Sequence, residues 1–410
     1  MSRILVVGET PVINSGFANV LRRLNQYFID QGHEVQQLGW CHLPHMEHHK
    51  FPYFIHPINF PKGGYYGQEL FDGIVYDYKP DIVFSLGDVY MVDWIPKAKT
   101  RNSFTWVSYM PIDSAPIPKS WVKTIEEMDF PVTYSKFGED VIKRQVPYTR
   151  NDVRMIYHGV DTKTFYPSDR TEIRGKNKIA LDKFILLYVG VNSVRKQIPR
   201  LLEAFDIFAK DKEDVLLWLH TSLSHNAGKE GWFLRDVINQ YNIINKIILS
   251  KQASPVAGVS EETMRMTYNV ADVFVSATQC EGFGLPFLEA AACGVPSIGV
   301  NYSAIPELIK DRGAVVPASD WILHTPYGMR RPLIDIRELS KKMSFMYHNK
   351  NHREQMGNNA LEFALTMDWE KILPSFKKLI EDASNYNEHK PSINIEKPVK
   401  VDRAIESVEI

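Results

Sequence analysis

The 410-residue chain has few cysteines and no long apolar run. Its three cysteines, Cys41, Cys280 and Cys293, form neither a paired framework nor a CxxC metal spacing. This scarcity predicts a reducing, cytoplasmic setting. No stretch approaches the roughly 20 apolar residues that a membrane-spanning helix needs, so peripheral contact with a membrane surface is the only membrane partner left open. The opening MSRILVVGET predicts a β-strand and lacks the cleavage site of a signal peptide.

An excess of charge is also absent. The 48 basic and 49 acidic residues leave a formal net charge of −1. This balance gives no indication of a nucleic-acid or acidic-polymer partner. A hydrophobic fraction of 44% and a charged fraction of 24% are typical of a soluble globular protein, and the length suits two domains.

The nicotinamide-dinucleotide motif is missing as well. Such a site would show G-x-G-x-x-G after the first strand and an acidic residue at the end of the second. The chain has Gly8 and then no glycine before Gly16, and its second strand ends in Gly39-Trp40. What remains is a loop in which Ser15-Gly16, just before a helix, could present N–H groups to a phosphate or a sugar hydroxyl. An ordinary βα loop is the alternative.

What the chain does contain is an alternation of short apolar runs with amphipathic stretches, typical of α/β proteins with parallel sheets. A helix is expected over 17–31, and the polar segment 168–182 is interpreted as a hinge or linker. A second strand series begins with FILLYVG at 184–190. The fold expected is therefore two Rossmann-like, doubly wound domains that face a central cleft, where the carboxyl ends of both sheets bind ligands. The expected boundaries are 1–167 (first domain), 168–365 (second domain), 366–386 (a late helix) and 387–410 (a polar tail).

A pair of cations stands in the loop after the strand at 184–190. Arg195 and Lys196 lie at the cleft end of that strand, just before a helix that starts near Ile198. Two cations suit a departing diphosphate, because its negative charge grows as its bond breaks. A solvated Arg-Lys pair on a surface loop is the alternative, and the position favours the functional interpretation.

The stretch EGFGLPFLEAAACGVP at 281–296 carries two glutamates eight positions apart. Pro286 fits the first turn of a helix. Gly282 and Gly284 would let backbone amides approach a ligand at the positive end of that helix. A carboxylate accepts two hydroxyl hydrogen bonds, which suits adjacent ribose or hexose hydroxyls. The alternative makes Glu281 a helix-dipole partner and Glu289 a solvated residue, but it explains the glycines poorly.

The pattern E-G-F-G-L-P-x-L-E-A-x-A-C-G-x-P resembles that of retaining glycosyltransferases of family 4, the group 1 or glycogen synthase type, which have the GT-B fold. The loop near Gly16, HGVDTKTF at 158–165, the Arg-Lys loop and AIPELI at 304–309 follow in the family's order. So does a late helix containing Trp369, which in this fold crosses back to the first domain. The resemblance covers residues 1–382.

The resemblance implies a role for each matching residue. Glu289 would bind the ribose hydroxyls of a nucleotide sugar, and Glu281 would contact the transferred sugar. Arg195 and Lys196 would stabilise the diphosphate leaving group. The donor-binding residues would be Gly16, Gly282, Phe283, Gly284, Leu285 and Glu289.

The chain departs from the family in two places. It has Val191-Asn192 where the family usually has an additional arginine, and SYMPIDSAPIP where the family often has a histidine. Asp113 is then the nearest polar candidate for the sugar pocket and joins the expected catalytic residues. The chain contains no D-x-D, the pattern with which the other large glycosyltransferase fold holds a metal ion. No metal site and no cofactor are therefore expected, and cationic side chains would neutralise the diphosphate.

The implied function is metal-independent, retaining transfer of a hexose from a UDP-, GDP- or ADP-sugar to a hydroxyl acceptor. The implied mechanism passes through an oxocarbenium-like state, with the leaving phosphate helping to deprotonate the acceptor. A sugar-nucleotide epimerase and a catalytically dead nucleotide-sugar-binding protein are the alternatives. The acceptor stays open among a lipid-linked glycan, a soluble sugar, a protein and a modified nucleic-acid base. The nucleotide base is expected near Lys251-Gln252.

Overall fold

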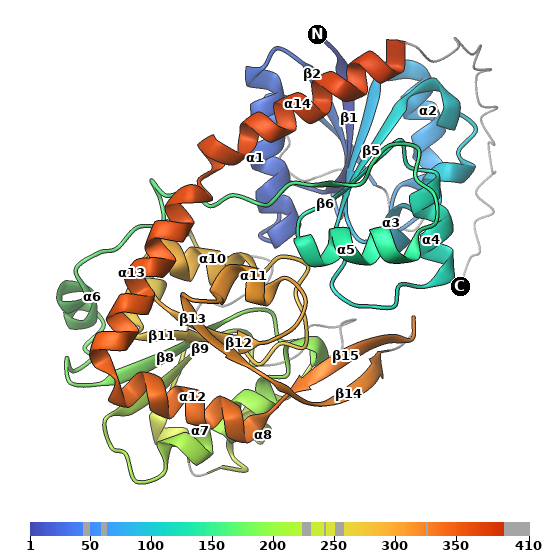
Figure 1. Cartoon of the computed structure of the whole chain (residues 1–410). Coiled ribbons are helices and arrows are strands. Elements are labelled where there is room, and N and C mark those ends of the chain that lie inside the picture. Colours follow the sequence, from blue (N-terminus) through green and yellow to red (C-terminus); the bar gives the residue numbers. More distant parts are fainter. Residues whose placement is uncertain are drawn as a thin grey trace, which may run out of the picture.

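The computed structural model describes residues 1–43, 50–58, 64–223, 231–241, 243–250, 258–324 and 327–388. They form two α/β domains, and a long helix near the C-terminus runs back across the first domain (Figure 1). The expected two-domain α/β fold is confirmed. The segment expected to contact the nucleotide base, Lys251-Gln252, and the tail from residue 389 lie outside the described residues.

The first domain is built on a parallel sheet with the strand order β3-β2-β1-β4-β5-β6-β7. Its strands are β1 (Arg3–Glu9), β2 (Glu34–Trp40), β3 (Phe54–Pro57), β4 (Ile82–Leu86), β5 (Thr105–Met110), β6 (Phe130–Thr133) and β7 (Arg154–Met155). Strands β4 and β5 are buried along their whole length, because helices cover both faces of the sheet. The order reverses between β1 and β4, and the carboxyl ends of these two strands therefore flank the crevice where such sheets bind ligands.

Helices α1 to α5 and two 3₁₀ turns belong to the first domain. They are α1 (Gly16–Asp30), α2 (Gln68–Tyr78), α3 (Val89–Val92), η1 (Ile95–Lys97), η2 (Arg101–Ser103), α4 (Lys119–Glu126) and α5 (Lys136–Gln145). Helix α1 begins one residue before the expected start, because Ser15 caps it and accepts a hydrogen bond from the N–H of Ala18. Its apolar stripe, which includes Leu21 and Leu24, is buried.

The second domain contains a parallel sheet with the order β10-β9-β8-β11-β12-β13, which reverses between β8 and β11. Its strands are β8 (Phe184–Val189), β9 (Val215–His220), β10 (Ile247–Leu249), β11 (Val273–Val275), β12 (Ser297–Val300) and β13 (Gly313–Val316). The helices and 3₁₀ turns are α6 (Arg170–Lys176), η3 (Val194–Lys196), α7 (Ile198–Ala209), α8 (Leu234–Ile238), η4 (Ile244–Lys246), α9 (Glu261–Val270), α10 (Leu285–Ala292), α11 (Ile305–Ile309), α12 (Ile336–His348) and α13 (Lys350–Thr366).

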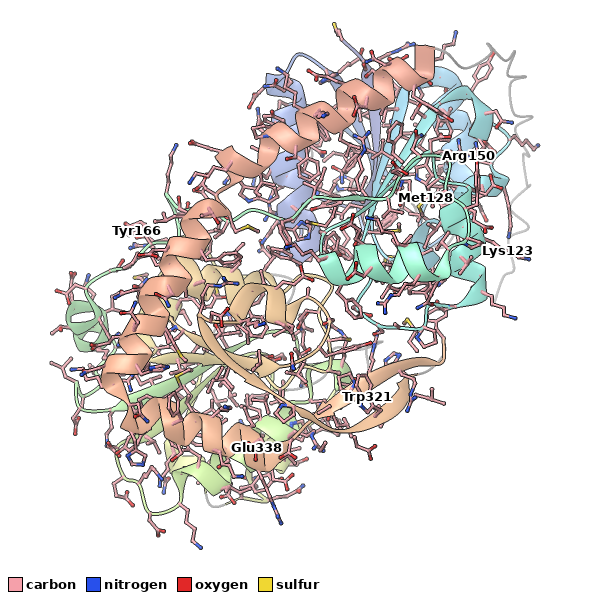
Figure 2. All side chains as sticks on the ribbon, in the orientation of Figure 1. Lys123, Met128, Arg150, Tyr166, Trp321 and Glu338 are labelled. Carbon is pink, nitrogen blue, oxygen red and sulfur yellow. The ribbon has the colours of Figure 1, made fainter. Side chains whose placement is uncertain are left out.

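An antiparallel hairpin interrupts this α/β alternation. It consists of β14 (Ala318–His324) and β15 (Met329–Ile334), between β13 and α12. The hairpin extends from the second domain toward the helices α4 and α5 of the first (Figure 1). Trp321, which is labelled in Figure 2, lies on its first strand.

The interpretation of residues 168–182 as a hinge or linker is wrong. Asp169 caps helix α6, which packs against α9. Arg174 is only 3% exposed, and its Nη2 donates to Oδ2 of Asp272 at 2.7 Å. The polar composition of the segment suggested solvent exposure. Its buried arginine has a partner 98 residues away, and no local pattern reveals that pairing.

Helices α14 (Trp369–Glu388) and α11 both take part in contacts that join the domains. Helix α14 lies on the first domain, where Phe376 meets the ring of Tyr109 edge-on at 5.1 Å. Glu307 of α11 accepts hydrogen bonds from the N–H groups of Lys136 (2.9 Å) and Phe137 (2.8 Å), the first residues of α5. It also accepts one from Oη of Tyr157 at 2.9 Å. A carboxylate from the second domain therefore caps a helix of the first, where the helix dipole favours negative charge.

Candidate active site

The basic pair of the second domain meets Glu281. Arg195 and Lys196 end the 3₁₀ turn after β8. Lys196 Nζ lies 2.5 Å from Oε1 of Glu281, and Arg195 Nη1 lies 3.1 Å from Oε2. Arg195 also donates to the backbone carbonyl of Cys280. The structure thus joins three of the four expected catalytic residues in one cluster and excludes the solvated-surface alternative for the two cations.

Ion pairing and burial together determine the protonation state of Glu281 in this cluster. The side chains of Lys196 and Glu281 are only 13% and 11% exposed. Burial alone would raise the pKa of Glu281, but Lys196 and then Arg195 hold it at about 2. Glu281 is therefore ionised at neutral pH, and two cations share one carboxylate. The cluster keeps one net positive charge, which suits an anionic ligand.

The loop between Glu281 and α10 depends on its glycines. Gly284 has φ +104°, a conformation that a side chain would strain, and it precedes α10 directly. A Cβ on Gly282 would lie 2.7 Å from Cβ of Pro111. Pro111 belongs to the first domain. Gly282 therefore permits the close approach of the two domains at this point.

Glu289 has different surroundings from Glu281. Its Oε2 accepts a hydrogen bond from Oη of Tyr268 at 2.6 Å. Burial raises the pKa of Glu289 to about 7, against the opposing effect of this hydrogen bond. Glu289 also lines a cavity of ≈ 50 Å³ at the junction of the domains, together with Leu285 of α10, Glu261 of α9 and Arg23 of α1.

The remaining residues that are expected to bind the donor lie beside α10. Phe283 is 4% exposed, and its ring meets that of His158 at 4.9 Å. A Cβ on Gly16 would be 3.5 Å from Cδ1 of Leu285. The loop after β1 therefore reaches the start of α10, and Gly16 and Leu285 lie on opposite sides of the domain junction.

Asp113, the fourth expected catalytic residue, forms an ion pair with Arg331 of the hairpin. Arg331 Nη2 lies 3.3 Å from its Oδ2, and Ser114 Oγ donates to its Oδ1 at 2.7 Å. Cys280 Sγ donates to Oδ2 at 3.3 Å, which connects Asp113 to the loop of Glu281. Burial would raise the pKa of Asp113, but Arg331 and then Arg195 hold it below its usual value.

Sequence reasoning missed Asp88. It follows β4, so that Glu9, Asp88 and Asp113 lie at the carboxyl ends of the neighbouring strands β1, β4 and β5. Burial, and then the charge of Asp113, raises the pKa of Asp88 to about 7. The signal was present as an acidic residue two positions after an apolar strand. Arg331 gave no such signal, because nothing in the sequence near it marks its partner Asp113, which is 218 residues away.

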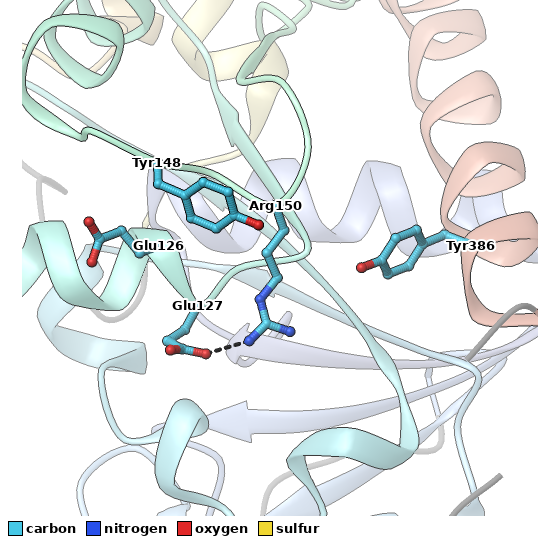
Figure 3. A pocket seen from close by; sticks show the side chains of 5 residues that line it. All are labelled: Glu126, Glu127, Tyr148, Arg150 and Tyr386. Atoms are coloured by element: carbon cyan, nitrogen blue, oxygen red, sulfur yellow. Dashed lines mark hydrogen bonds and ion pairs between the residues drawn. The ribbon is translucent and has the colours of Figure 1, made fainter. Parts of the chain in front are cut away.

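A surface pocket also lies away from these residues. It has a volume of ≈ 590 Å³ and is lined by Glu126, Glu127, Tyr148, Arg150 and Tyr386. Arg150 and Glu127 form an ion pair across it, 2.5 Å apart (Figure 3). None of the expected site residues lines it. The described residues contain no group of three or more His, Cys, Asp or Glu side chains placed to hold a metal ion, and no helix among them is long and apolar enough to cross a membrane.

Sequence comparison identifies relatives of this chain. Residues 169–363 match the family model described as Glycosyl transferases group 1. O-antigen chain mannosyltransferase B of Escherichia coli is 26% identical over 267 residues, which are 60% of this chain and 63% of that protein. D-inositol 3-phosphate glycosyltransferase of Paenarthrobacter aurescens (strain TC1) is 28% identical over 215 residues, 52% of this chain and 47% of that protein. The chain thus spans less than two-thirds of the length of these relatives.

Solved structures share the fold over nearly the whole chain. Sucrose-phosphate synthase from Thermosynechococcus elongatus has a TM-score of 0.74 at 18% identity and covers 94% of this chain and 100% of its own. The Anabaena protein HepE in complex with UDP-glucose has a TM-score of 0.71 at 13% identity, with 93% and 100% covered. The chain therefore has the GT-B fold of these structures.

Proposed function

We propose that the chain is a retaining glycosyltransferase that moves a hexose from a nucleoside-diphosphate sugar to a hydroxyl acceptor. The observation that carries this proposal is the cluster of Arg195, Lys196 and Glu281 at the start of α10. Such a cluster combines positive charge for a diphosphate with a carboxylate for sugar hydroxyls. The family of residues 169–363 and the UDP-glucose bound to HepE support a nucleotide-sugar donor.

The two cations have the central role in this chemistry. As the bond between the anomeric carbon and the phosphate oxygen breaks, negative charge grows on the diphosphate. Arg195 and Lys196 would stabilise that charge in a site shielded from water, where a fixed donor is most effective. Their contact with Glu281 keeps both side chains in place before the donor arrives. Glu289 would accept hydrogen bonds from the ribose.

Glu281 is a poor candidate for a covalent nucleophile. With a pKa of about 2 and two cationic partners, its carboxylate is weakly basic and already engaged. A role as a hydrogen-bond acceptor for the transferred sugar fits this state better. We therefore propose retention through an oxocarbenium-like state in which the acceptor oxygen bonds to the anomeric carbon. Its proton passes to an oxygen of the departing diphosphate.

Neither alternative function is favoured. Loss of Glu281 or of the basic pair would mark a dead nucleotide-sugar-binding protein, and all three residues are present and in contact. A sugar-nucleotide epimerase would change the donor without an acceptor. We propose that the enzyme needs no metal ion, because Arg195 and Lys196 supply the positive charge. A cytoplasmic location accords with the low cysteine content.

A ligand screen and a product assay test the proposal. The melting temperature is measured with UDP, GDP, ADP and their glucose and mannose conjugates, since a ligand at 100 times its Kd stabilises the folded state by about 2.7 kcal/mol. One nucleotide class should raise the melting temperature. The anomeric configuration of the product is then read by proton NMR. An inverted anomer, or an altered donor sugar formed without acceptor, would contradict the proposal.

A further inference from the structure

The hairpin β14–β15 belongs to the second domain but is anchored in the first. Arg330 forms an antiparallel bridge with Ala115, in the segment after β5. Met329 is 2% exposed and packs into the apolar core beneath the first sheet. Arg331 is 6% exposed, and its Nε donates to Oγ of Ser114 at 3.0 Å. These contacts hold the end of the hairpin against the carboxyl ends of β4 and β5.

Aromatic rings surround the tip of the anchored hairpin. The ring of Tyr327 stacks on that of Tyr90, with centroids 5.4 Å apart and an interplanar angle of 29°. Tyr327 also contacts the ring of Trp121 at 5.4 Å, and Tyr66 meets Tyr90 edge-on at 6.3 Å. Tyr327 remains 36% exposed. Tyr66, Tyr90 and Tyr327, which we call the tyrosine group, therefore come from three distant segments and keep part of their surface accessible.

The tyrosine group lies next to Asp88. Burial raises the pKa of all three phenol groups, and the negative charge of Asp88 raises each pKa further. Asp88 is half-buried, and its carboxylate has no hydrogen-bond partner among the described residues. The charges of Arg195 and Arg331 also reach it. Asp88 directly precedes helix α3, which carries Tyr90.

This combination has the chemistry of a sugar-ring site. The faces of aromatic rings pack against the C–H surface of a pyranose, and a carboxylate accepts hydrogen bonds from adjacent hydroxyls. Binding sites commonly combine such an apolar surface with a few polar groups that fix the orientation of the ligand. A protein or nucleic-acid acceptor would need a wider contact surface than three rings and one carboxylate.

We propose that the hairpin completes an acceptor subsite for a sugar ring, bounded by Asp88, Tyr90 and Tyr327. This inference rests on the proposed glycosyltransferase function and names the acceptor of that function as a carbohydrate. Asp88 accepts a hydrogen bond from one acceptor hydroxyl, while a second hydroxyl attacks the anomeric carbon. The bond to the diphosphate oxygen breaks, and the proton of the attacking hydroxyl leaves with the diphosphate.

The test uses the donor found by the nucleotide screen and simple glycosides as acceptor probes. Transfer is measured to methyl hexopyranosides and to dodecyl hexopyranosides in detergent. The variants are Asp88→Asn, Tyr327→Ala and Tyr327→Phe, with Asp140→Asn and Tyr148→Ala as controls at exposed positions. Turnover of methyl glycosides points to a soluble sugar and turnover of dodecyl glycosides alone to a lipid-linked glycan. Both outcomes support a sugar-ring site.

Asp88→Asn and Tyr327→Ala should each raise the KM for the glycoside roughly tenfold or more, because each removes a specific contact. Tyr327→Phe, which keeps the ring, should stay close to wild type. The Kd of the nucleoside diphosphate should stay within about twofold, which corresponds to about 0.4 kcal/mol. An unchanged KM in both variants, or transfer to peptides or oligonucleotides but to no glycoside, overturns the proposal. A wild-type protein that binds no nucleotide instead refutes the proposed function itself.

Discussion

The two sides of the cleft hold their charges in different ways. On the second domain, Glu281 finds both of its cations, Arg195 and Lys196, within the same domain. On the first domain, Asp113 takes its cation, Arg331, from the hairpin of the other domain. Asp88 has no ion pair among the described residues. The cluster of Arg195, Lys196 and Glu281 is therefore complete within one domain, whereas the ion pair of Asp113 exists only when the domains dock.

The two sides should therefore respond differently when the domains move relative to each other. A site complete within one domain keeps its geometry when the domains move, and it can bind its ligand first. A site shared between domains is sensitive to their relative position. Closure of the two domains around a bound ligand can assemble such a site. Under the proposed function, this arrangement predicts that the donor binds before the acceptor. The following predictions test the contrast between the two sides.

Lys196→Ala should show the largest effect. A fixed electrostatic donor of this kind is worth about 10²–10³ in rate, so kcat should fall by that factor while the donor KM rises much less. Arg195→Ala should lose less, and the double variant should be nearly inactive, because Val191-Asn192 supplies no further cation. Steady-state kinetics are compared with Lys341→Ala, a change on the exposed face of α12. Wild-type kcat in Lys196→Ala would refute the leaving-group role.

Glu289→Ala should weaken nucleotide binding without unfolding the protein. Above pH 7, where Glu289 is ionised, loss of this charged hydrogen-bonding partner costs about 1.5–3 kcal/mol, which is roughly a tenfold to hundredfold rise in Kd. Titration calorimetry with the preferred nucleoside diphosphate, which carries no sugar, measures it. The exposed Glu362 supplies a matched control, Glu362→Ala. An unchanged Kd in a folded variant removes Glu289 from the ribose site.

Glu289 should also make stability depend on pH. Its pKa rises from 4.5 to about 7 on folding. The folded state then holds a proton that the unfolded state releases between these values, so the contribution of this group is fully present below pH 4.5 and is lost as the pH rises to about 7. The melting temperature of Glu289→Gln minus that of wild type should therefore increase as the pH rises from 4.5 to 8. A difference that stays constant across this range, as expected for Glu362→Gln, contradicts the raised pKa.

Glu307→Ala should loosen the contact between the domains. It removes a carboxylate that accepts hydrogen bonds from two N–H groups at the start of α5. Contacts of this kind contribute about 1–2 kcal/mol, so we expect a roughly fivefold to thirtyfold rise in the acceptor KM. The nucleotide Kd should change less, because the cluster of Arg195, Lys196 and Glu281 lies within the second domain. An equal rise in the acceptor KM and in the nucleotide Kd would contradict the contrast between the two sides.

Chelation should have the smallest effect. Arg195 and Lys196 supply the positive charge that a metal ion would otherwise provide, so kcat with EDTA should match kcat without it. The measurement is initial-rate transfer after dialysis against the chelator. Loss of turnover with EDTA and recovery with magnesium or manganese would show that the two cations are insufficient.

The donor side could be inferred from sequence because its residues follow short local patterns. Glycines, a proline and two glutamates fall within sixteen residues at 281–296, and each constrains the backbone or the charge at one helix start. Gly282 shows the limit of this inference, because its closest contact is with Pro111 of the other domain. The acceptor side has no such local pattern. Asp113 and Arg331 are 218 residues apart, and Glu307 lies 171 residues from Lys136.

The sequence by itself determined the α/β class, the alternation of strands and helices, and local details such as the Ser15 cap and the turn at Gly284. These follow from short-range backbone preferences and hydrophobic periodicity, which a few adjacent residues encode. Only the tertiary structure decided that Arg331 pairs with Asp113, that the hairpin docks on the first domain, and that the pKa of Asp88 rises. Electrostatic energies depend on burial and on distances between side chains, and both are set by residues far apart in the chain.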